Sequence, residues 1–191
     1  ISCDIYFFQL AVKMGIKNIN IIMRNFGFGS KTGIDLHEEL GGLIPTPEWK
    51  MGTQGQHWYP GDTVISGIGQ GFLLTTPLQL AHGVSGIATR GQLFTPYLLK
   101  TRKPPNQPSI DTSPIALKPA IIDSKYWDLV IEAMEAVVMT PGGTAYDRYG
   151  KVPYTVAGKT GTAQLFSTGG KDKPKEEDLP EHLKDNTVFI A

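Results

Sequence analysis

The sequence predicts an α+β fold, with helices along most of the chain and two antiparallel strands near its C-terminal end. Apolar residues recur at helical spacing through residues 124–138 and in shorter stretches before them. Residues 154–166 and 187–191 have instead the apolar and β-branched character of strands. The 191 residues include 22 glycines and 14 prolines, which indicates many tight turns between these elements.

The N-terminal segment predicts two helices. Ser2 to Asp4 can cap the first helix, and Gly15 can close it as a left-handed C-terminal residue. The second helix fits Ile19 to Asn25. Because the first helix is apolar on nearly all sides, we expect it to lie inside a core.

Two helices that begin with proline follow along the chain. Thr46 and Pro47 supply the cap and first position of one helix, and Thr76 and Pro77 begin the other. Residues 51–75 are rich in glycine and also carry aromatic and apolar side chains. This stretch is therefore predicted to be a long but ordered loop.

The next stretch, residues 101–119, is rich in proline, which predicts an extended surface crossing or a domain boundary. Asp123 then caps an amphipathic helix that ends at residues 141–143, and Thr144 can cap one further turn.

The last part of the chain predicts a strand pair. The strand at residues 154–166 contains Gly158 and Gly161, and glycine inside a strand often marks the close approach of a ligand or another backbone. A polar loop at residues 167–186 leads to the final strand, which begins at Thr187 and could pair antiparallel with the first.

Charge and cysteine content exclude several classes of function. Lys plus Arg and Asp plus Glu each number 18, so the net charge is zero, and we predict no nucleic-acid partner. Cys3 is the only cysteine, which excludes an internal disulfide and a zinc site made of cysteines alone. The four histidines lack ligand spacing, so we predict no metal and no cofactor. Gly158-Lys159-Thr160 is not a P-loop, because Pro153 stands where that motif needs glycine.

Both ends of the sequence are apolar, whereas chain termini are usually polar. We therefore expect residues 1–191 to be part of a single domain that is truncated at both ends. A compact domain with buried ends is the alternative.

Two short motifs carry candidate chemistry: Ser2-Cys3-Asp4 at the head of the first helix, and Lys159-Thr160-Gly161-Thr162 on a predicted strand. Each motif also has an ordinary explanation, since Ser2 and Asp4 can cap a helix and Lys159 can be a solvated strand residue. Lys31-Thr32-Gly33 matches the second pattern as well, but it lies in a predicted turn.

Longer stretches give these motifs their specificity. Six stretches of this sequence resemble, in the same order, the transpeptidase domain of class B penicillin-binding proteins. They are residues 33–36, 43–50, 58–63, 66–71, 75–79 and 157–164. Asp4 and the Ile-Pro-Thr-Pro-Glu-Trp-Lys stretch at residues 44–50 are most similar to the group that acts in cell elongation.

The resemblance implies an α/β sandwich of the penicillin-binding and serine β-lactamase type. This chain would supply a mostly helical subdomain and two antiparallel strands of an incomplete five-stranded sheet. The Ser-x-x-Lys motif and the first strands would lie upstream, and the last strand and C-terminal helix downstream.

The resemblance also implies an activity: a peptidoglycan D,D-transpeptidase that cross-links D-Ala-D-Ala stem peptides by serine acyl transfer and is trapped by β-lactam antibiotics. By position, Ser2 would relay a proton, Asp4 would orient substrate and lysine, and Lys159 would supply positive charge. The substrate-binding residues would be Thr160, Gly161 and Thr162. The Thr162 N–H would also serve the oxyanion hole.

Ser-x-x-Lys, which carries the nucleophile of the family, occurs nowhere in these 191 residues. We therefore expect the isolated chain to be inactive, and its incomplete sheet to favour self-association. The parent enzyme would be anchored in the cell membrane, face the periplasm and work with cell-wall elongation proteins. The alternatives are a β-lactamase or β-lactam sensor on the same fold, and a catalytically dead relative that binds partners.

Overall fold

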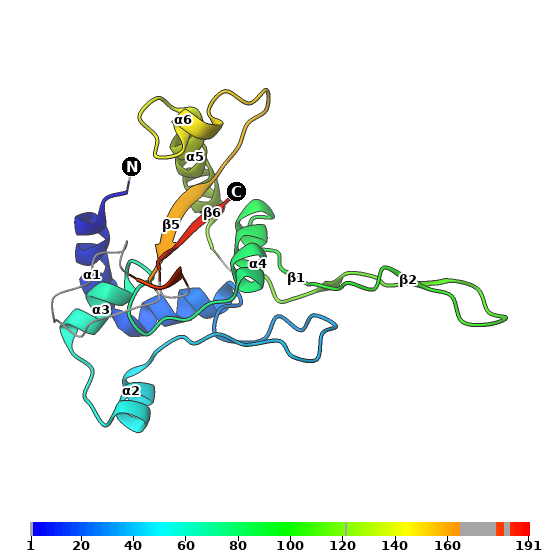
Figure 1. The fold of residues 1–191 in the computed structure, drawn as a ribbon, viewed down its shortest axis with the longest axis horizontal. Helices are drawn as coiled ribbons and strands as arrows, with labels where there is room; N and C mark the ends of the chain where they lie inside the picture. Colours follow the sequence, from blue (N-terminus) through cyan, green and yellow to red (C-terminus); the bar gives the residue numbers. More distant parts are fainter. Residues whose placement is uncertain (1, 121, 165–178, 182–183) are drawn as a thin grey trace. The chain divides into compact units, whose positions relative to one another are not determined.

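The computed structural model describes residues 2–120, 122–164, 179–181 and 184–191. The chain divides into two compact units, residues 3–128 and residues 129–191 together with the first two residues. Figure 1 shows the path of the chain. In the part of the chain that is described, no helix is both long and apolar enough to span a membrane.

Helix α1 (Asp4–Asn25) is one run that is interrupted at Gly15, where φ is +72° and ψ is 153°. The two predicted helices are therefore present, and they meet at this glycine. Cys3 precedes the helix and no side chain caps it, so the prediction of a cap from Ser2 to Asp4 is wrong.

The surface of α1 is apolar over much of its length. Ala11 and Ile16 are buried, but several large side chains are 45–70% exposed: Ile5, Tyr6, Phe7, Val12 and Ile21. The prediction that this helix lies inside a core is therefore met on one side only, as far as the described residues show.

Helix α2 (Pro47–Gln54) begins as predicted, because the Thr46 hydroxyl accepts a hydrogen bond of 3.0 Å from the Trp49 amide. Helix α3 (Pro60–Ser66) corrects the prediction of one loop over residues 51–75. Its start is set by Pro60 at the first helical position and by Asp62, whose carboxylate accepts from the Tyr59 amide at 2.7 Å.

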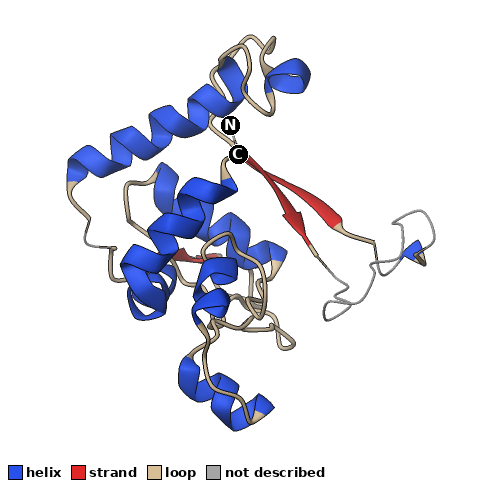
Figure 2. Cartoon of the chain, turned by 90° about the vertical axis from the view of Figure 1, so that its left-hand side faces the viewer, coloured by secondary structure: helices blue, strands red, loops and turns tan. Residues whose placement is uncertain are grey.

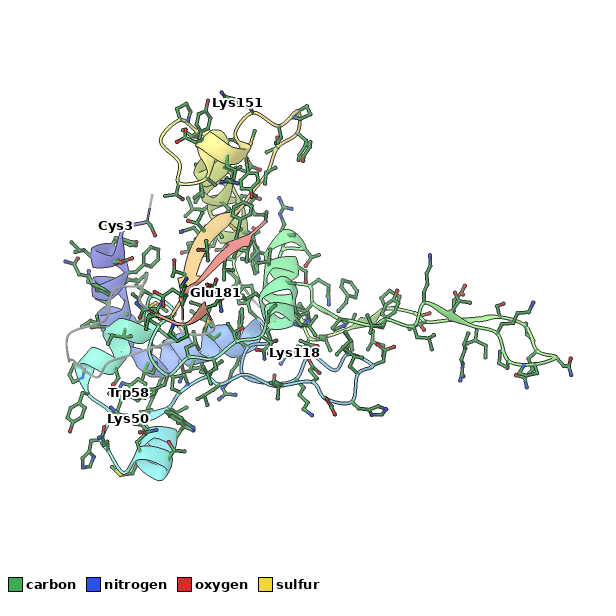
Figure 3. All side chains as sticks on the ribbon, viewed as in Figure 1. Cys3, Lys50, Trp58, Lys118, Lys151 and Glu181 are labelled. Atoms are coloured by element: carbon green, nitrogen blue, oxygen red, sulfur yellow. The ribbon has the colours of Figure 1, made fainter. Side chains whose placement is uncertain are left out.

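A buried ion pair joins α2 to the start of α3. Lys50 is only 3% exposed, and its Nζ lies 2.6 Å from Oδ2 of Asp62. The ammonium also faces the rings of Tyr59 and Phe72, 4.9 and 5.5 Å from their centroids. Figure 3 labels Lys50 and Trp58 in this region. Aromatic side chains thus order the stretch, as predicted.

Helix α4 (Pro77–Ala88) starts at the predicted position with a reciprocal cap. The Gln79 amide donates to the Thr76 hydroxyl at 3.1 Å, and the Thr76 amide donates to Oε1 of Gln79 at 3.0 Å. Gln79 is completely buried, and its Nε2 donates to the carbonyls of Ser30 and Gly41, both at 2.7 Å. This side chain therefore ties the start of α4 to the loop before α2.

Residues 94–116, called the arm below, are extended. Strand β1 (Phe94–Thr95) pairs antiparallel with β4 (Ile115–Ala116), and β2 (Thr101–Arg102) pairs antiparallel with β3 (Ile110–Asp111). Figure 1 shows the arm extending from the end of α4. The extended crossing predicted for residues 101–119 is confirmed, and the boundary between units lies later, after residue 128.

Asp35 fastens the arm to the loop that follows α1. Its carboxylate accepts hydrogen bonds from the amides of Leu98 at 2.7 Å and Leu99 at 3.0 Å. These two bonds hold the pKa of Asp35 below its ordinary value of 3.8.

Helix α5 (Ser124–Met139) starts after Asp123, whose carboxylate accepts from the Lys125 amide at 3.2 Å, so the predicted cap is confirmed. Helix α6 (Tyr146–Tyr149) follows a turn, and its cap is Ala145 without a side-chain hydrogen bond. The prediction that Thr144 caps this turn is therefore wrong. Val137, Val138 and Ala145 form the buried core of this unit, against which the following residues pack: Met139, Val156 and Phe189.

Strand β5 (Lys159–Ala163) pairs antiparallel with β6 (Asn186–Ile190), as predicted, with Lys159 opposite Ile190 and Thr162 opposite Thr187. Figure 2 shows the two strands side by side. β5 is shorter than the predicted strand at residues 154–166. Its approach is held by α5, because the Gly158 amide donates to the Met134 carbonyl at 3.1 Å. The predicted loop at 167–186 and the last two residues of the predicted strand lie mainly outside the described residues.

Candidate active site

Gly158 lets β5 lie close against β6 just before the Lys-Thr-Gly-Thr motif. It is buried, and a Cβ at this position would lie 2.8 Å from both the Ile190 carbonyl oxygen and the Phe189 ring. Tyr149 stacks on the same Phe189 ring with centroids 4.8 Å apart. The strand that carries the motif is therefore seated on the core of its own unit.

Lys159 is half-buried, and its ammonium is surrounded by oxygen atoms. Nζ lies 2.7 Å from the Thr160 carbonyl and 3.5 Å from both the Thr160 hydroxyl and the Ser2 hydroxyl. Ser2 and Lys159 are 157 residues apart in sequence, so the fold of their unit brings one residue of each motif together. In the described part of the chain no carboxylate lies within ion-pair distance of this ammonium. It is a cation without an internal counter-ion there.

A second hydroxyl stands beside Thr160. Oγ1 of Thr144 lies 3.3 Å from Oγ1 of Thr160, and either atom could be the donor. The sequence predicts a different role for Thr144, that of a helix cap. Its three-residue context, Gly-Gly-Thr after an amphipathic helix, carries no signal that it would face a strand 16 residues later.

Gly161 leaves an open place on β5. A Cβ at this position would meet no atom nearer than the Val188 carbonyl oxygen at 4.0 Å. Packing inside the described chain therefore does not require glycine here, in contrast to Gly158. A strand position that is open and lacks a side chain allows another extended backbone to approach.

The remaining predicted site residues lie as follows. Thr162 is exposed on β5, opposite Thr187 of β6. Asp4 is exposed in the first turn of α1 and belongs to the unit of residues 3–128. Cys3, between the two predicted residues of the first motif, is a free and exposed thiol.

The arrangement around Lys159 is suited to binding an anion. It offers one ammonium and the hydroxyls of Thr160 and Ser2 next to an accessible strand. Charge-assisted hydrogen bonds from such a set favour a carboxylate. Over the residues described, no group of three or more His, Cys, Asp or Glu side chains could hold a metal ion.

Comparison with known proteins gives a consistent result. The family model for the penicillin binding protein transpeptidase domain matches residues 1–191. The peptidoglycan D,D-transpeptidase MrdA of Salmonella typhimurium strain LT2 is 37% identical over 195 residues, which include the whole of this chain and 31% of the relative. The chain thus spans about a third of that protein's length.

Two solved structures resemble the fold. PBP2 of Pseudomonas aeruginosa, in complex with WCK 5153, has a TM-score of 0.73 and 41% identity over 85% of this chain and 36% of that one. PBP2 of Helicobacter pylori, in complex with MreC, has a TM-score of 0.76 and 32% identity over 97% of this chain and 31% of that one. These neighbours confirm the predicted α+β fold class and the resemblance seen in the sequence, and the chain belongs to the penicillin-binding protein transpeptidase domain family.

Proposed function

We propose that this chain supplies the second and third catalytic motifs of a peptidoglycan D,D-transpeptidase that acts in cell-wall elongation. The observation that carries the proposal is the approach of Lys159 Nζ to the Ser2 hydroxyl, 3.5 Å apart. A serine that only capped a helix and a lysine that was only solvated would not be expected to lie in contact. The contact between Ser2 and Lys159 therefore favours a shared role for the two residues.

The proposed reaction is acyl transfer through a serine ester. The serine of a Ser-x-x-Lys motif, which these 191 residues do not contain, attacks the carbonyl of the penultimate D-Ala and gives up its hydroxyl proton to the lysine of that motif. The peptide bond breaks, and the leaving amine of the last D-Ala takes up a proton through the Ser2 hydroxyl. The amine of a neighbouring stem peptide then attacks the ester, loses a proton by the same route and releases the serine.

Lys159 has two functions in this proposal. Its positive charge lies beside the Ser2 hydroxyl and favours the transfer of a proton from that hydroxyl to the leaving amine. The same charge attracts the terminal carboxylate of the donor peptide. Thr160 and Thr162 offer hydroxyls to that carboxylate, and the Thr162 amide donates to the oxyanion. Gly161 leaves room for the donor to lie along β5, which the open space at this position supports. Asp4 orients the substrate amide and the lysine of the nucleophile motif.

We further propose that residues 1–191 form part of one larger transpeptidase domain. The share of the MrdA relative that the chain covers, 31%, supports this, as does the exposed apolar surface of α1. The stem peptides of peptidoglycan are the proposed substrates and β-lactams the proposed inhibitors. Elongation proteins are the proposed partners, and a membrane-anchored enzyme facing the periplasm is the proposed setting, by analogy with the family.

Intact-mass spectrometry of the full-length protein that contains this chain tests the proposal. We expect benzylpenicillin to add one whole inhibitor mass. Replacing Lys159 by alanine should slow this acylation at least tenfold, because the inhibitor carboxylate loses its cation. Lys151→Ala is the matched control, since Lys151 is an exposed lysine of the same unit, marked in Figure 3, outside the candidate site.

Each outcome has a distinct meaning. An adduct that forms and is then rapidly hydrolysed would point to a β-lactamase. A stable adduct without cross-linking of stem peptides would point to a sensor. No adduct on a folded protein would overturn the proposal in favour of a catalytically dead relative.

A further inference from the structure

Thr144 is held rigidly at the C-terminal end of α5. The Gly143 amide donates to the Thr140 carbonyl at 2.9 Å, and the Ala145 amide donates to the Val137 carbonyl at 3.1 Å. Ala145 is 5% exposed within the core of the unit. Gly143 has no room for a side chain, because a Cβ would collide with the Val137 carbonyl. The backbone on both sides of Thr144 is thus fixed by the core.

The Thr144 side chain uses this fixed position to face β5. Its hydroxyl lies 3.3 Å from the Thr160 hydroxyl and makes no cap for α6. Thr144 is itself exposed. The contact therefore does not result from burial, and it adds a hydroxyl to the group around Lys159 that the sequence motifs do not include.

The direction of the hydrogen bonds follows from the chemistry of the groups. An ammonium only donates, so Lys159 can only donate to the Thr160 oxygen, 3.5 Å away. A hydroxyl has one hydrogen. If a substrate carboxylate accepts that hydrogen, the Thr160 oxygen has a lone pair left to accept from a further donor. The Thr144 hydroxyl is placed to be that donor.

We propose that Thr144 is a positioning residue that orients the Thr160 hydroxyl hydrogen toward the carboxylate of the donor peptide or of a β-lactam. This inference rests on the proposed transpeptidase function and extends it by one residue. In the bound state the Thr144 O–H donates to Oγ1 of Thr160, and the Thr160 O–H donates to the carboxylate. The chain of two hydroxyls makes recognition of an anionic group depend on a turn outside the family's Lys-Thr-Gly motif.

The test uses the full-length protein and three variants. Thr144→Val keeps the shape of the side chain and removes the hydroxyl, and we expect acylation by benzylpenicillin to be about three- to tenfold less efficient, the loss typical of one hydrogen bond. Thr144→Ser keeps the hydroxyl and should restore the rate to within about twofold of the wild type. Thr140→Val removes an exposed hydroxyl from the same turn and should change nothing.

Two further measurements separate orientation from a general structural effect. In a Thr160→Val background, Thr144→Val should cause no additional loss, because the hydroxyl that it orients is gone. The loss caused by Thr144→Val should also appear in KM of the donor peptide rather than in kcat. Melting temperatures of all variants should match that of the wild type.

The results distinguish this inference from the proposed function. If the wild-type protein is acylated but Thr144→Val is acylated equally fast, the orienting role is wrong and the transpeptidase proposal stands. If Thr144→Ser is as slow as Thr144→Val, the effect comes from packing, and the inference also fails. If the wild type forms no adduct, the proposed function itself has failed.

Discussion

Gly158, which directly precedes β5, and Gly161, which lies within it, lack a side chain for different physical reasons. At Gly158, a Cβ would come within 2.8 Å of backbone and ring atoms of β6, so the fold requires a residue without a side chain. At Gly161, the atom nearest to a Cβ would be 4.0 Å away, so the fold does not require glycine at this position. The first glycine therefore belongs to the packing of the unit, and the second to whatever approaches the strand.

Alanine at each position should separate these roles. Gly158→Ala is expected to lower the free energy of unfolding by about 1–3 kcal/mol, because backbone atoms of β6 would have to shift. Gly161→Ala should leave it unchanged or raise it by up to about 1 kcal/mol, as for alanine at an unstrained glycine. It should nevertheless slow acylation by benzylpenicillin. Urea denaturation and acylation rates in the full-length protein measure the two effects. Normal acylation of Gly161→Ala would show that no substrate lies against this position.

At the scale of the elements, the arm makes few buried contacts with the rest of its unit. Its strand pairs are only two residues long, and most of its side chains are exposed. The carboxylate of Asp35 contributes two hydrogen bonds to its backbone, at Leu98 and Leu99. Attachment of the arm to the loop after α1 therefore depends on one charged group.

This dependence should make the attachment sensitive to acid. The Leu98 and Leu99 amides lower the pKa of Asp35 in the folded chain, so the stabilisation is complete above the ordinary value of 3.8. It is lost as the pH falls through the lower folded value. In a pH titration by NMR, the amide protons of Leu98 and Leu99 should shift together below pH 3.8.

Two variants control that titration. Asp35→Asn should abolish the shared shift, because no charge is left to neutralise. Asp111→Asn should preserve it, since Asp111 contacts Thr101 within the arm and neither of the two amides. A titration of these amides that persists in Asp35→Asn would assign it to another group.

The sequence predicts elements well where the signal is local. Thr46-Pro47 and Thr76-Pro77 start helices as expected, because capping depends on three or four neighbouring residues. Helix α3 was missed because its glycine-rich surroundings hide a short start signal. The pairs β1–β4 and β2–β3 are too short to show any alternation.

The candidate site was predictable only through its resemblance to a family. No spacing rule relates Ser2 to Lys159 across 157 residues, so their meeting is a property of the tertiary fold. Thr144 was missed because a threonine before a short helix has an obvious local role as a cap. The contact that it makes instead is to a strand that the sequence could not place beside it.

At the scale of the whole molecule, apolar side chains remain uncovered. Ile5 is 70% exposed, Tyr6 60% and Val12 61%, all on the first half of α1. Large apolar side chains that are exposed together on one helix often mark a contact with another part of a protein or with another chain. When the 191 residues are studied without further sequence, this surface faces water.

We therefore expect the isolated chain to self-associate. Its mass by light scattering should rise with concentration, and a double variant with Ile5→Gln and Val12→Gln should reduce that rise by removing apolar contacts. Lys13→Gln, on the same helix, is the control and should have no effect. A chain that stays monomeric at every concentration would contradict the expectation.

The buried pair of Lys50 and Asp62 has a consequence for how this protein can vary in evolution. Losing Asp62 alone leaves the buried Lys50 ammonium without its counter-charge, and an unpaired buried charge costs about 3–5 kcal/mol, a large part of the stability of a typical domain. Replacing both together with apolar residues of similar volume can be nearly neutral. Lineages should therefore keep both residues or exchange both, and a sequence that has lost only one should carry a compensating change near the rings of Tyr59 and Phe72.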